Sequence, residues 1–238
     1  LTQAQVDSVL SALTRRLADE PVHRILGARE FYGMTLSLSQ ETLEPRPDTE
    51  ALVDLVLPSL RAIADEKGAC RVLDLGTGTG AIALALLSQD ARAHALATDI
   101  STDALATARA NANMTGVGER FVTRASRWFD AVEESFDIIV SNPPYIPSKD
   151  IASLEREVRN YDPLAALDGG TDGLDAYRAI ARDAAAHLEP GGVVAVEIGY
   201  DQEADVVSIF EHQGLRHEQS ARDLGGVMRA LLFRLTNA

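Results

Sequence analysis

The chain has 238 residues, of which 46% are hydrophobic and 24% charged, so it can bury the core of one large domain or of one domain with a small appendage. A formal net charge of −14 disfavours proteins that grip a nucleic-acid backbone over a long footprint. The single cysteine, Cys70, excludes an internal disulfide framework and a zinc site built on several thiolates.

The start of the chain lacks targeting features. Residues 1–7 have neither the basic start nor the apolar stretch of a signal peptide, and no apolar run reaches the length of a membrane span. We therefore expect a cytoplasmic protein. Leu1 stands where an initiator Met is expected, so we also expect this sequence to begin inside a longer chain.

The first predicted element is an amphipathic helix. Thr2 and Gln5 form a capping-box pattern, and apolar residues follow at helical spacing over residues 6–17. Such a helix either packs on the main domain or is the remnant of a larger helical unit. Residues 21–43 alternate over short stretches, which predicts a hairpin. We place the domain boundary near Thr42, between a segment 1–42 and a domain 43–238.

Beyond this boundary, strands and helices alternate, which predicts a parallel sheet covered on both faces. A helix capped by Asp48-Thr49 should run through Leu60. Further helices are expected over residues 81–87, 102–113 (capped by Ser101), 174–187 and 202–213. The expected strands span residues 70–75, 93–98, 120–123, 136–141, 191–198, 215–218 and 228–235.

A glycine-rich turn follows the first of these strands. The turn Gly76-Thr77-Gly78-Thr79-Gly80 separates that strand from a helix, and the next strand ends at Asp99. Free N–H groups at such a turn, together with an acid that can accept from ribose hydroxyls, predict an adenosine-containing ligand. The spacing Gly76-x-Gly78-x-x-Ala81 also satisfies the nicotinamide fingerprint. Asp74 would repel a pyrophosphate but attract the positive charges of S-adenosylmethionine, which favours methyl transfer.

A second motif, Asn142-Pro143-Pro144-Tyr145, ends an apolar strand. Two prolines make this loop rigid and rich in acceptors, and it follows a strand at the edge where open α/β sheets bind ligands. The Asn142 side-chain oxygen and the Pro143 carbonyl can accept both N–H groups of a planar amine or amide, and Tyr145 offers a face for packing. The motif predicts a clamp for a substrate nitrogen.

Together these motifs resemble the class I S-adenosylmethionine-dependent methyltransferases that act on exocyclic or amide nitrogen. Residues 30–33 and 45–50, and residues 196–199 with Gln202, are similar to the protein-(glutamine-N5) methyltransferases of the PrmC/HemK group, which modify the glutamine of the Gly-Gly-Gln motif in peptide chain release factors. The resemblance runs from about residue 21 to 235. Two positions depart from the family's pattern: Arg127 stands where an acid near the adenine is usual, and Glu44 where an aliphatic residue is usual.

The resemblance implies an α/β fold with a Rossmann-like, seven-stranded, mostly parallel sheet whose last strand is antiparallel, after a remnant of an N-terminal helical substrate-binding domain plus a hairpin. It implies S-adenosyl-L-methionine as cofactor, no metal, release factors as protein substrates, no stable nucleic-acid or membrane binding, and a monomer. The implied cofactor-binding residues are Asp74, Gly76, Thr77, Gly78, Gly80, Asp99, Ile100, Trp128, Asn142, Arg46 and Thr49. The implied substrate-binding residues are Asn142, Pro143, Pro144, Tyr145 and Glu197, of which Asn142, Pro143 and Tyr145 are catalytic.

Three other functions are compatible with parts of the pattern. Enzymes that methylate N6 of adenine in DNA or RNA use the same Asn-Pro-Pro-Tyr motif on a flipped base. Such an enzyme is expected to have a basic face or a target-recognition domain to bind the nucleic acid, and this chain offers neither clearly. A nicotinamide-dependent oxidoreductase fits the glycine turn and leaves residues 142–145 unexplained. A non-catalytic binding protein would leave the amide clamp idle. The five histidines show no metal-ligand spacing. Asp162-Pro163 and the acidic, glycine-rich residues 168–173 are expected to form a loop beside the active site.

Overall fold

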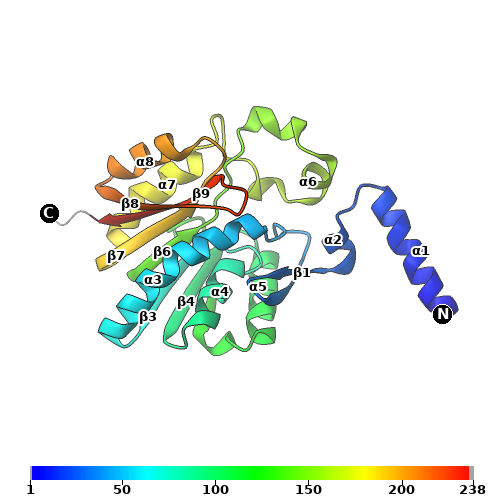
Figure 1. Ribbon diagram of the computed structural model, residues 1–238, viewed down its shortest axis with the longest axis horizontal. Coiled ribbons are helices and arrows are strands. Elements are labelled where there is room, and N and C mark those ends of the chain that lie inside the picture. Colours follow the sequence, from blue (N-terminus) through cyan, green and yellow to red (C-terminus); the bar gives the residue numbers. More distant parts are fainter. Residues whose placement is uncertain (1, 236–238) are drawn as a thin grey trace.

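A seven-stranded sheet runs through the body of the molecule and carries helices on both faces (Figure 1). The structure is a computed structural model, and it describes residues 2–235. The strand order is β5-β4-β3-β6-β7-β9-β8, in which β9 alone runs antiparallel to its neighbours. The strands are β3 (Cys70–Leu75), β4 (Ala93–Asp99), β5 (Phe121–Ala125), β6 (Phe136–Ser141), β7 (Leu188–Glu197), β8 (Leu215–Arg222) and β9 (Met228–Leu235). The predicted mostly parallel sheet with an antiparallel last strand is confirmed.

Two apolar layers sandwich the sheet because successive side chains of a strand point to opposite faces. Val72 of β3 packs into the layer of α3 (Glu50–Lys67), α4 (Ala81–Gln89) and α5 (Thr102–Met114). Leu73 packs into the opposite layer, with α7 (Asp175–Ala184) and α8 (Glu203–Glu211). No helix within residues 2–235 is both long and apolar enough to cross a membrane.

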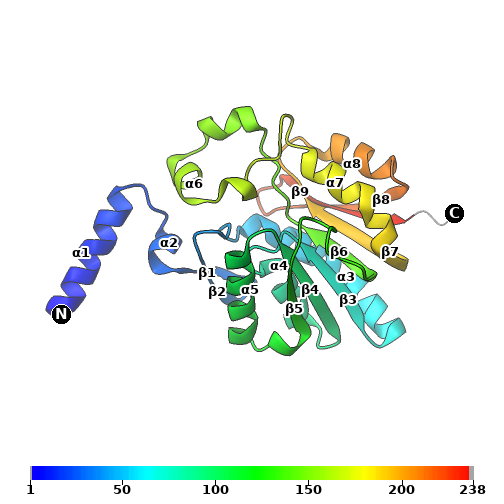
Figure 2. The same ribbon diagram turned by 180° about the vertical axis from the view of Figure 1, so that it is seen from behind.

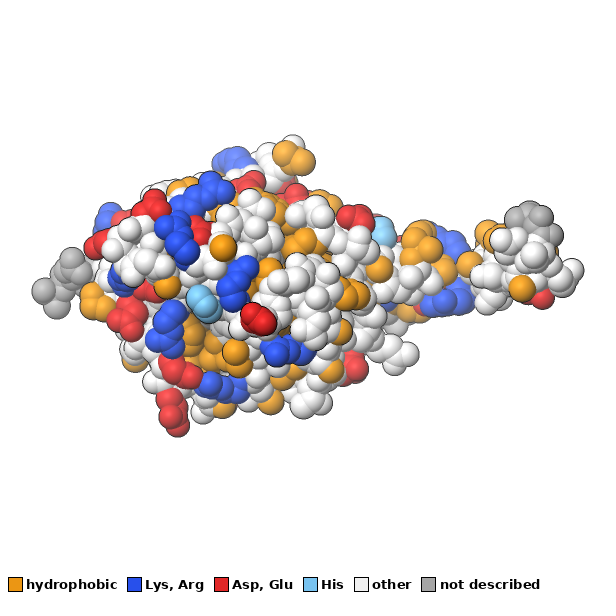
Figure 3. Space-filling model, turned by 90° about the horizontal axis from the view of Figure 1, so that it is seen from below, with side chains coloured by type: hydrophobic (Ala, Val, Ile, Leu, Met, Phe, Trp, Pro, Cys, Tyr) orange, Lys and Arg blue, Asp and Glu red, His pale blue; other side chains and the backbone are white. Residues whose placement is uncertain are grey.

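The first helix projects from this body as an arm (Figures 2 and 3). In α1 (Gln3–Leu17) the predicted capping box is present: the Gln5 N–H donates to the Thr2 hydroxyl at 3.3 Å, and the Thr2 N–H to the Gln5 side chain at 2.8 Å. None of the helix's residues is buried. Its apolar side chains are 53–86% exposed: Val9, Leu10, Leu13 and Leu17. The alternative in which this helix packs on the main domain is therefore not observed.

The predicted hairpin is confirmed and lies against the body. Strands β1 (Ala28–Phe31) and β2 (Met34–Ser37) pair antiparallel, and Phe31 and Leu36 join the apolar layer of α3, α4 and α5. A short helix, α2 (Val22–Leu26), precedes the hairpin and was not predicted. It is too short to show helical periodicity.

The start and the end of α3 differ from prediction. Asp48 and Thr49 do not cap it, because neither side chain makes a cap hydrogen bond: Asp48 pairs with Arg229 at 3.2 Å, and Thr49 bonds Asn142. The helix also continues past the predicted end at Leu60 to Lys67. Its interior Pro58 is exposed, and Gly68 closes the helix in a left-handed conformation with an N–H bond to the Ala64 carbonyl.

Elsewhere the predicted elements hold with shifted ends. The start of β7 departs most from prediction. This strand begins at Leu188, before the glycine pair 191–192 that was predicted to open it, and its register against β6 is irregular there. β8 extends to Arg222 rather than ending at 218. The helix α6 (Arg156–Tyr161) was not predicted; it buries no residue, so its sequence shows no apolar stripe.

Asn111 of α5 ties the hairpin to the body. This fully buried side chain accepts from the Ser37 N–H at 2.9 Å and donates to the Ser37 carbonyl at 3.1 Å and the Thr79 carbonyl at 2.9 Å. One amide thus satisfies polar backbone groups of β2 and of the glycine turn. Because unmade hydrogen bonds of buried groups are costly, this residue should stabilise the whole molecule.

We expect Asn111→Ala to lower the free energy of unfolding by about 2–4 kcal/mol, since it leaves up to three backbone groups without a partner. Urea denaturation measures the effect. Asn113→Ala is the matched control, because Asn113 is an exposed asparagine of the same helix and the change to Ala there should slightly stabilise it. Equal stability of the two variants would contradict the role of Asn111.

Candidate active site

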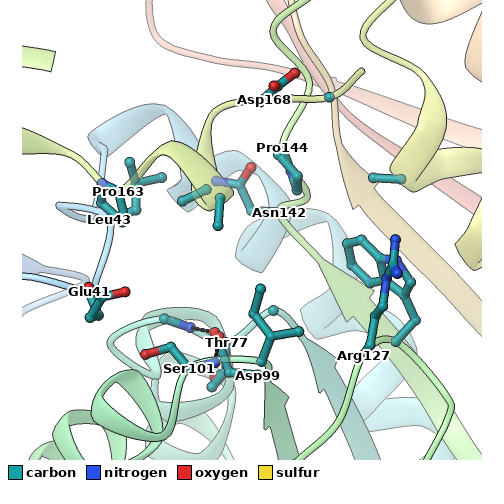
Figure 4. A pocket seen from close by; sticks show the side chains of 18 of the residues that line it. Glu41, Leu43, Thr77, Asp99, Ser101, Arg127, Asn142, Pro144, Pro163 and Asp168 are labelled. Atoms are coloured by element: carbon teal, nitrogen blue, oxygen red, sulfur yellow. Dashed lines mark hydrogen bonds between the residues drawn. The ribbon is translucent and has the colours of Figure 1, made fainter. Parts of the chain in front are cut away.

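A cavity of about 870 Å³ opens at the carboxyl edge of the parallel strands. In Figure 4, Thr77, Asp99 and Ser101 form one wall, Asn142 and Pro144 the opposite one, and Arg127 closes one side. Segments far apart in the chain complete the lining, with the region of Glu41 and Leu43 facing the body across the cavity. This is the edge at which open α/β sheets bind ligands.

The glycine turn forms the floor of one half of the cavity. Gly76, Gly78 and Gly80 all have positive φ values, of 69°, 54° and 86°, which residues with a Cβ rarely adopt. Asp99 holds the turn, because its Oδ2 accepts from the Gly78 N–H and its Oδ1 from the Ser101 N–H, each at 2.9 Å. An ionised carboxylate has about four acceptor sites, so each oxygen keeps capacity for a further donor.

Asp74 lies fully buried beneath this turn. The Thr77 hydroxyl donates to its Oδ2 at 2.7 Å, while its Oδ1 has no hydrogen-bond partner within residues 2–235. Burial raises the pKa of Asp74 from 3.8 to about 6, since a charge loses its hydration there. A buried acceptor without a hydrogen-bond partner destabilises the fold, and a cationic group of a ligand would remove this cost.

Trp128 and Ile100 give this half of the cavity its apolar surface. Ile100 is 61% exposed, and Trp128 has φ +50°, an uncommon conformation for a bulky residue. Outliers of this kind gather at ligand sites. Next to Trp128, Arg127 lines the cavity, at the position where the family's pattern has an acid.

The Asn142-Pro143-Pro144-Tyr145 segment forms the other half. The Asn142 amide donates from Nδ2 to the Thr49 hydroxyl at 3.3 Å, and no donor within residues 2–235 bonds its Oδ1. Nor does any donor in this range bond the Pro143 carbonyl. The chain itself therefore leaves both predicted acceptors unpaired.

Gln202 fixes the loop that carries these acceptors. Its Nε2 donates to the Tyr145 carbonyl at 3.0 Å, and its Oε1 accepts from the Gly199 N–H at 2.9 Å. Gly173 packs so closely on the loop that a Cβ added to it would lie 2.4 Å from the backbone carbonyl oxygen of Tyr145. Tyr145 is half-buried, and burial together with the charge of Glu197 raises its pKa to about 12. The loop is thus held rigidly from behind.

Glu197, at the end of β7, is buried behind the same loop. Burial raises its pKa from 4.5 to about 7, while hydrogen bonds from Thr49 and Asn142 and the charge of Arg229 oppose the rise. One of its oxygens, Oε2, has no hydrogen-bond partner in the described part of the chain.

The structure brings most of the predicted site residues to one cavity. Those that line it are Arg46, Thr49, Gly76, Thr77, Gly78, Asp99, Ile100, Trp128, Asn142 and Pro144. The others surround the cavity without lining it: Asp74, Gly80, Pro143, Tyr145 and Glu197. Arg46 also pairs with the buried Asp162 at 2.9 Å.

Sequence reasoning missed several lining residues. Glu41 and Leu43, for example, lie in a segment without a motif, so nothing local marks them. The predicted loop beside the site is confirmed for Pro163, Asp168, Gly169 and Gly170, which line the cavity. Within residues 2–235 there is no group of three His, Cys, Asp or Glu side chains that could hold a metal ion.

Comparisons with known proteins agree with this geometry. A family model described as methyltransferase small domain matches residues 53–157. Proteins named release factor glutamine methyltransferase are similar to almost the whole chain: one from Agrobacterium fabrum is 54% identical over 98% of this chain and 81% of its own length, and one from Rhodospirillum rubrum is 46% identical over 98% and 70%.

Solved structures resemble the fold. The ribosomal protein L11 methylase from Lactobacillus delbrueckii subsp. bulgaricus has a TM-score of 0.59 at 21% identity, with 82% of each chain covered. The hMettl16 catalytic domain, in complex with an RNA hairpin of the MAT2A 3'UTR, has a TM-score of 0.66 at 17% identity over 91% of this chain and 82% of that chain. These likenesses show the Rossmann-like fold of class I methyltransferases.

The burial of Asp74 makes stability depend on pH. Because its folded pKa lies above the unfolded value, the folded state holds the proton more tightly, and stability falls as pH rises from about 4 through about 6. We expect Asp74→Asn to reduce the loss of unfolding free energy between pH 5 and 8 by about 1–2 kcal/mol. Urea denaturation at both pH values tests this. Asp103→Asn, which changes an exposed aspartate at the start of α5, should leave the wild-type slope, and an equal slope for Asp74→Asn would contradict the prediction.

Proposed function

Because the chain belongs to the family of release factor glutamine methyltransferases, we propose that it methylates the side-chain amide nitrogen, N5, of the glutamine in the Gly-Gly-Gln motif of peptide chain release factors. The observation that carries this function is the Asn142 side chain, which lines the same cavity as the glycine turn and whose oxygen is left unpaired, as is the carbonyl of the adjacent Pro143. N6-adenine methylation is not favoured, since the relatives named above are glutamine methyltransferases.

The cavity fits S-adenosylmethionine, which supplies the electrophilic methyl group. Asp99 keeps acceptor sites beside the glycine turn for the two ribose hydroxyls. The unpartnered Oδ1 of Asp74 suits a cationic group, and Ile100 and Trp128 offer apolar surface for the adenine. Arg46 also lines the cavity, where it pairs with Asp162.

The substrate amide is a poor nucleophile because its lone pair is delocalised into the carbonyl. Asn142 Oδ1 and the Pro143 carbonyl would accept its two N–H groups and so turn the nitrogen lone pair toward the methyl group. Tyr145 and Pro144 would hold the flat face of the amide. The rigid loop behind them, fixed by Gln202, keeps this arrangement preorganised.

Methyl transfer to three acceptors tests the function. Tritiated S-adenosylmethionine should label a bacterial release factor, but neither the same factor with its Gly-Gly-Gln glutamine replaced nor DNA. Label in DNA with none in the release factor would overturn the proposal and favour adenine methylation. We further propose that the protein acts as a monomer in the cytoplasm, where release factors act, without stable nucleic-acid binding.

Asn142→Ala should lower kcat about 10²–10³-fold, because it removes one preorganised polar contact to the reacting group. The affinity for S-adenosylmethionine, measured by calorimetry, should stay nearly unchanged. Asn113→Ala, a change at an exposed residue that does not line the cavity, serves as control for both measurements. Weak cofactor binding with normal turnover at saturation would place Asn142 on the cofactor instead.

Residues 1–42 are proposed to be part of a helical substrate-binding unit together with the hairpin. The exposed apolar face of α1 supports this, because such a face on a helix without buried residues suits contact with a protein. The double change Leu10→Ser and Leu13→Ser should therefore raise the KM for release factor about tenfold or more, with an unchanged affinity for S-adenosylmethionine. Leu224→Ser, a fully exposed leucine between β8 and β9, is the control. An unchanged KM in the double variant would show that this face does not bind the substrate.

A further inference from the structure

Three side chains from separate parts of the chain meet at the cavity wall, which Thr49 and Asn142 line while Glu197 is buried behind them. Asn142 follows β6, Thr49 immediately precedes α3, and Glu197 ends β7. Asn142 Nδ2 donates to the Thr49 hydroxyl at 3.3 Å, and both side chains lie close enough to the Glu197 carboxylate to oppose the rise of its pKa. Thr49 and Glu197 are only 4% and 2% exposed, so water does not compete for these contacts.

The chemistry of these groups fixes their directions. An ionised carboxylate only accepts hydrogen bonds, so the Asn142 group that faces Glu197 must be its NH₂. The Thr49 hydroxyl can accept from Asn142 and donate to Glu197 at the same time. With the NH₂ turned to these two partners, Oδ1 becomes the free end of the amide. An inverted amide would set its oxygen against the carboxylate in a buried, low-dielectric place.

We propose that Thr49 and Glu197, which the resemblance implies as a cofactor-binding and a substrate-binding residue, are instead positioning residues that hold the Asn142 amide with its oxygen available to the substrate and that act through Asn142. This inference rests on the proposed function, which assigns that oxygen to the substrate N–H. It also accounts for Thr49 lacking a cap hydrogen bond at the start of α3 and for a carboxylate buried at the end of β7.

Four charged or titratable residues interact with Glu197. Arg229 of β9 and Asp48 face it, Tyr145 lies in the loop, and Tyr177 of α7 donates its hydroxyl to the Glu197 backbone carbonyl at 3.0 Å. Burial raises the pKa of Tyr145 to about 12 and that of Tyr177 well above 10. Burial would lower the pKa of Arg229, but its hydrogen bond to Asp223 and nearby negative charges raise it. Glu197, with a pKa of about 7, can therefore change charge near neutral pH while these three groups do not. When protonated, its carboxyl can donate, and the amide is no longer held in one orientation.

A double-mutant cycle separates this role from a general structural one. Thr49→Val should lower kcat for release factor about 10–100-fold with little change in the affinity for S-adenosylmethionine, and Thr49→Ser, which keeps the hydroxyl, should restore most of it. In an Asn142→Ala background, Thr49→Val should change kcat less than twofold, because the residue that it orients is gone. Thr42→Val, at another buried, hydrogen-bonded threonine, is the control for loss of a hydroxyl. Equal losses in both backgrounds, or a large loss of cofactor affinity, would overturn the proposal.

The pH dependence gives a second readout. At saturating cofactor, the wild-type kcat should rise about tenfold between pH 6 and 8, as the Glu197 carboxylate forms. Glu197→Gln should give a low, flat profile. Asp137→Asn changes a buried aspartate of β6 that pairs with Lys67 at 2.6 Å, and it should keep the wild-type profile. A Glu197→Gln profile that still rises like the wild type would contradict the role of Glu197.

A measurement without methyl transfer keeps this inference separate from the proposed function. The side-chain NH₂ signals of Asn142 in a nitrogen–proton correlation spectrum, identified by their loss in Asn142→Ala, should shift with a midpoint near pH 7. This shift should vanish in Glu197→Gln and persist in Asp137→Asn. If release factor is not labelled but the shift is present, the function fails while the orientation of Asn142 stands. If the factor is labelled but the signals do not respond to pH, the positioning role fails.

Discussion

The register of four parallel strands decides where the chemistry of this protein lies. Across β4, β3, β6 and β7, Thr98 pairs with Leu75, Leu75 with Ser141, and Ser141 with Val196. The residues that follow this row in the four strands are Asp99, Gly76, Asn142 and Glu197. The Ser141 hydroxyl reinforces the row by donating to the Leu75 carbonyl at 2.7 Å. This backbone pairing brings the four residues to one edge of the sheet. The register is fixed because a slip of one residue would turn every side chain of a strand to the other face.

The buried acids of the sheet fall into two kinds, which lie at opposite ends of its parallel strands. Asp137, near the amino end of β6, is satisfied by Lys67 and by the Arg71 N–H at 2.8 Å. Asp74 and Glu197, at the carboxyl ends of β3 and β7, each keep an oxygen without a partner, and burial raises both pKa values. A fold that needed these acids only for stability would pair them, because an unpaired buried carboxylate is destabilising. Their cost is consistent with roles toward a ligand and toward Asn142.

Much of the site could be predicted from local patterns in the sequence. The contacts between distant segments could not. The glycine turn, Asp99 and the Asn142 loop each follow a strand whose apolar run is visible in the sequence, so their common edge could be deduced. Thr49 looked like a helix cap, because an Asp-Thr pair before an apolar helix normally is one. Only the folded chain shows that its hydroxyl instead meets Asn142, 93 positions away. Likewise, no periodicity marks the contact between Gln202 and the Tyr145 carbonyl.

The segment 1–42 consists of two parts that are attached differently. The hairpin contributes Phe31 and Leu36 to the apolar layer and is bound by Asn111, whereas α1 buries nothing. Between them, Arg24 of α2 donates to the Thr42 carbonyl at 2.5 Å and to Asp162 at 2.8 Å, and Asp162 also accepts from Arg46 on the cavity wall. Arg24 and Asp162 have side chains only 7% and 2% exposed, so this bridge is shielded from solvent. Asp162 thus joins α2 to Arg46, which lines the cavity, so the part of segment 1–42 that follows α1 is fixed to the catalytic body both by apolar packing of the hairpin and by this buried ion-pair bridge.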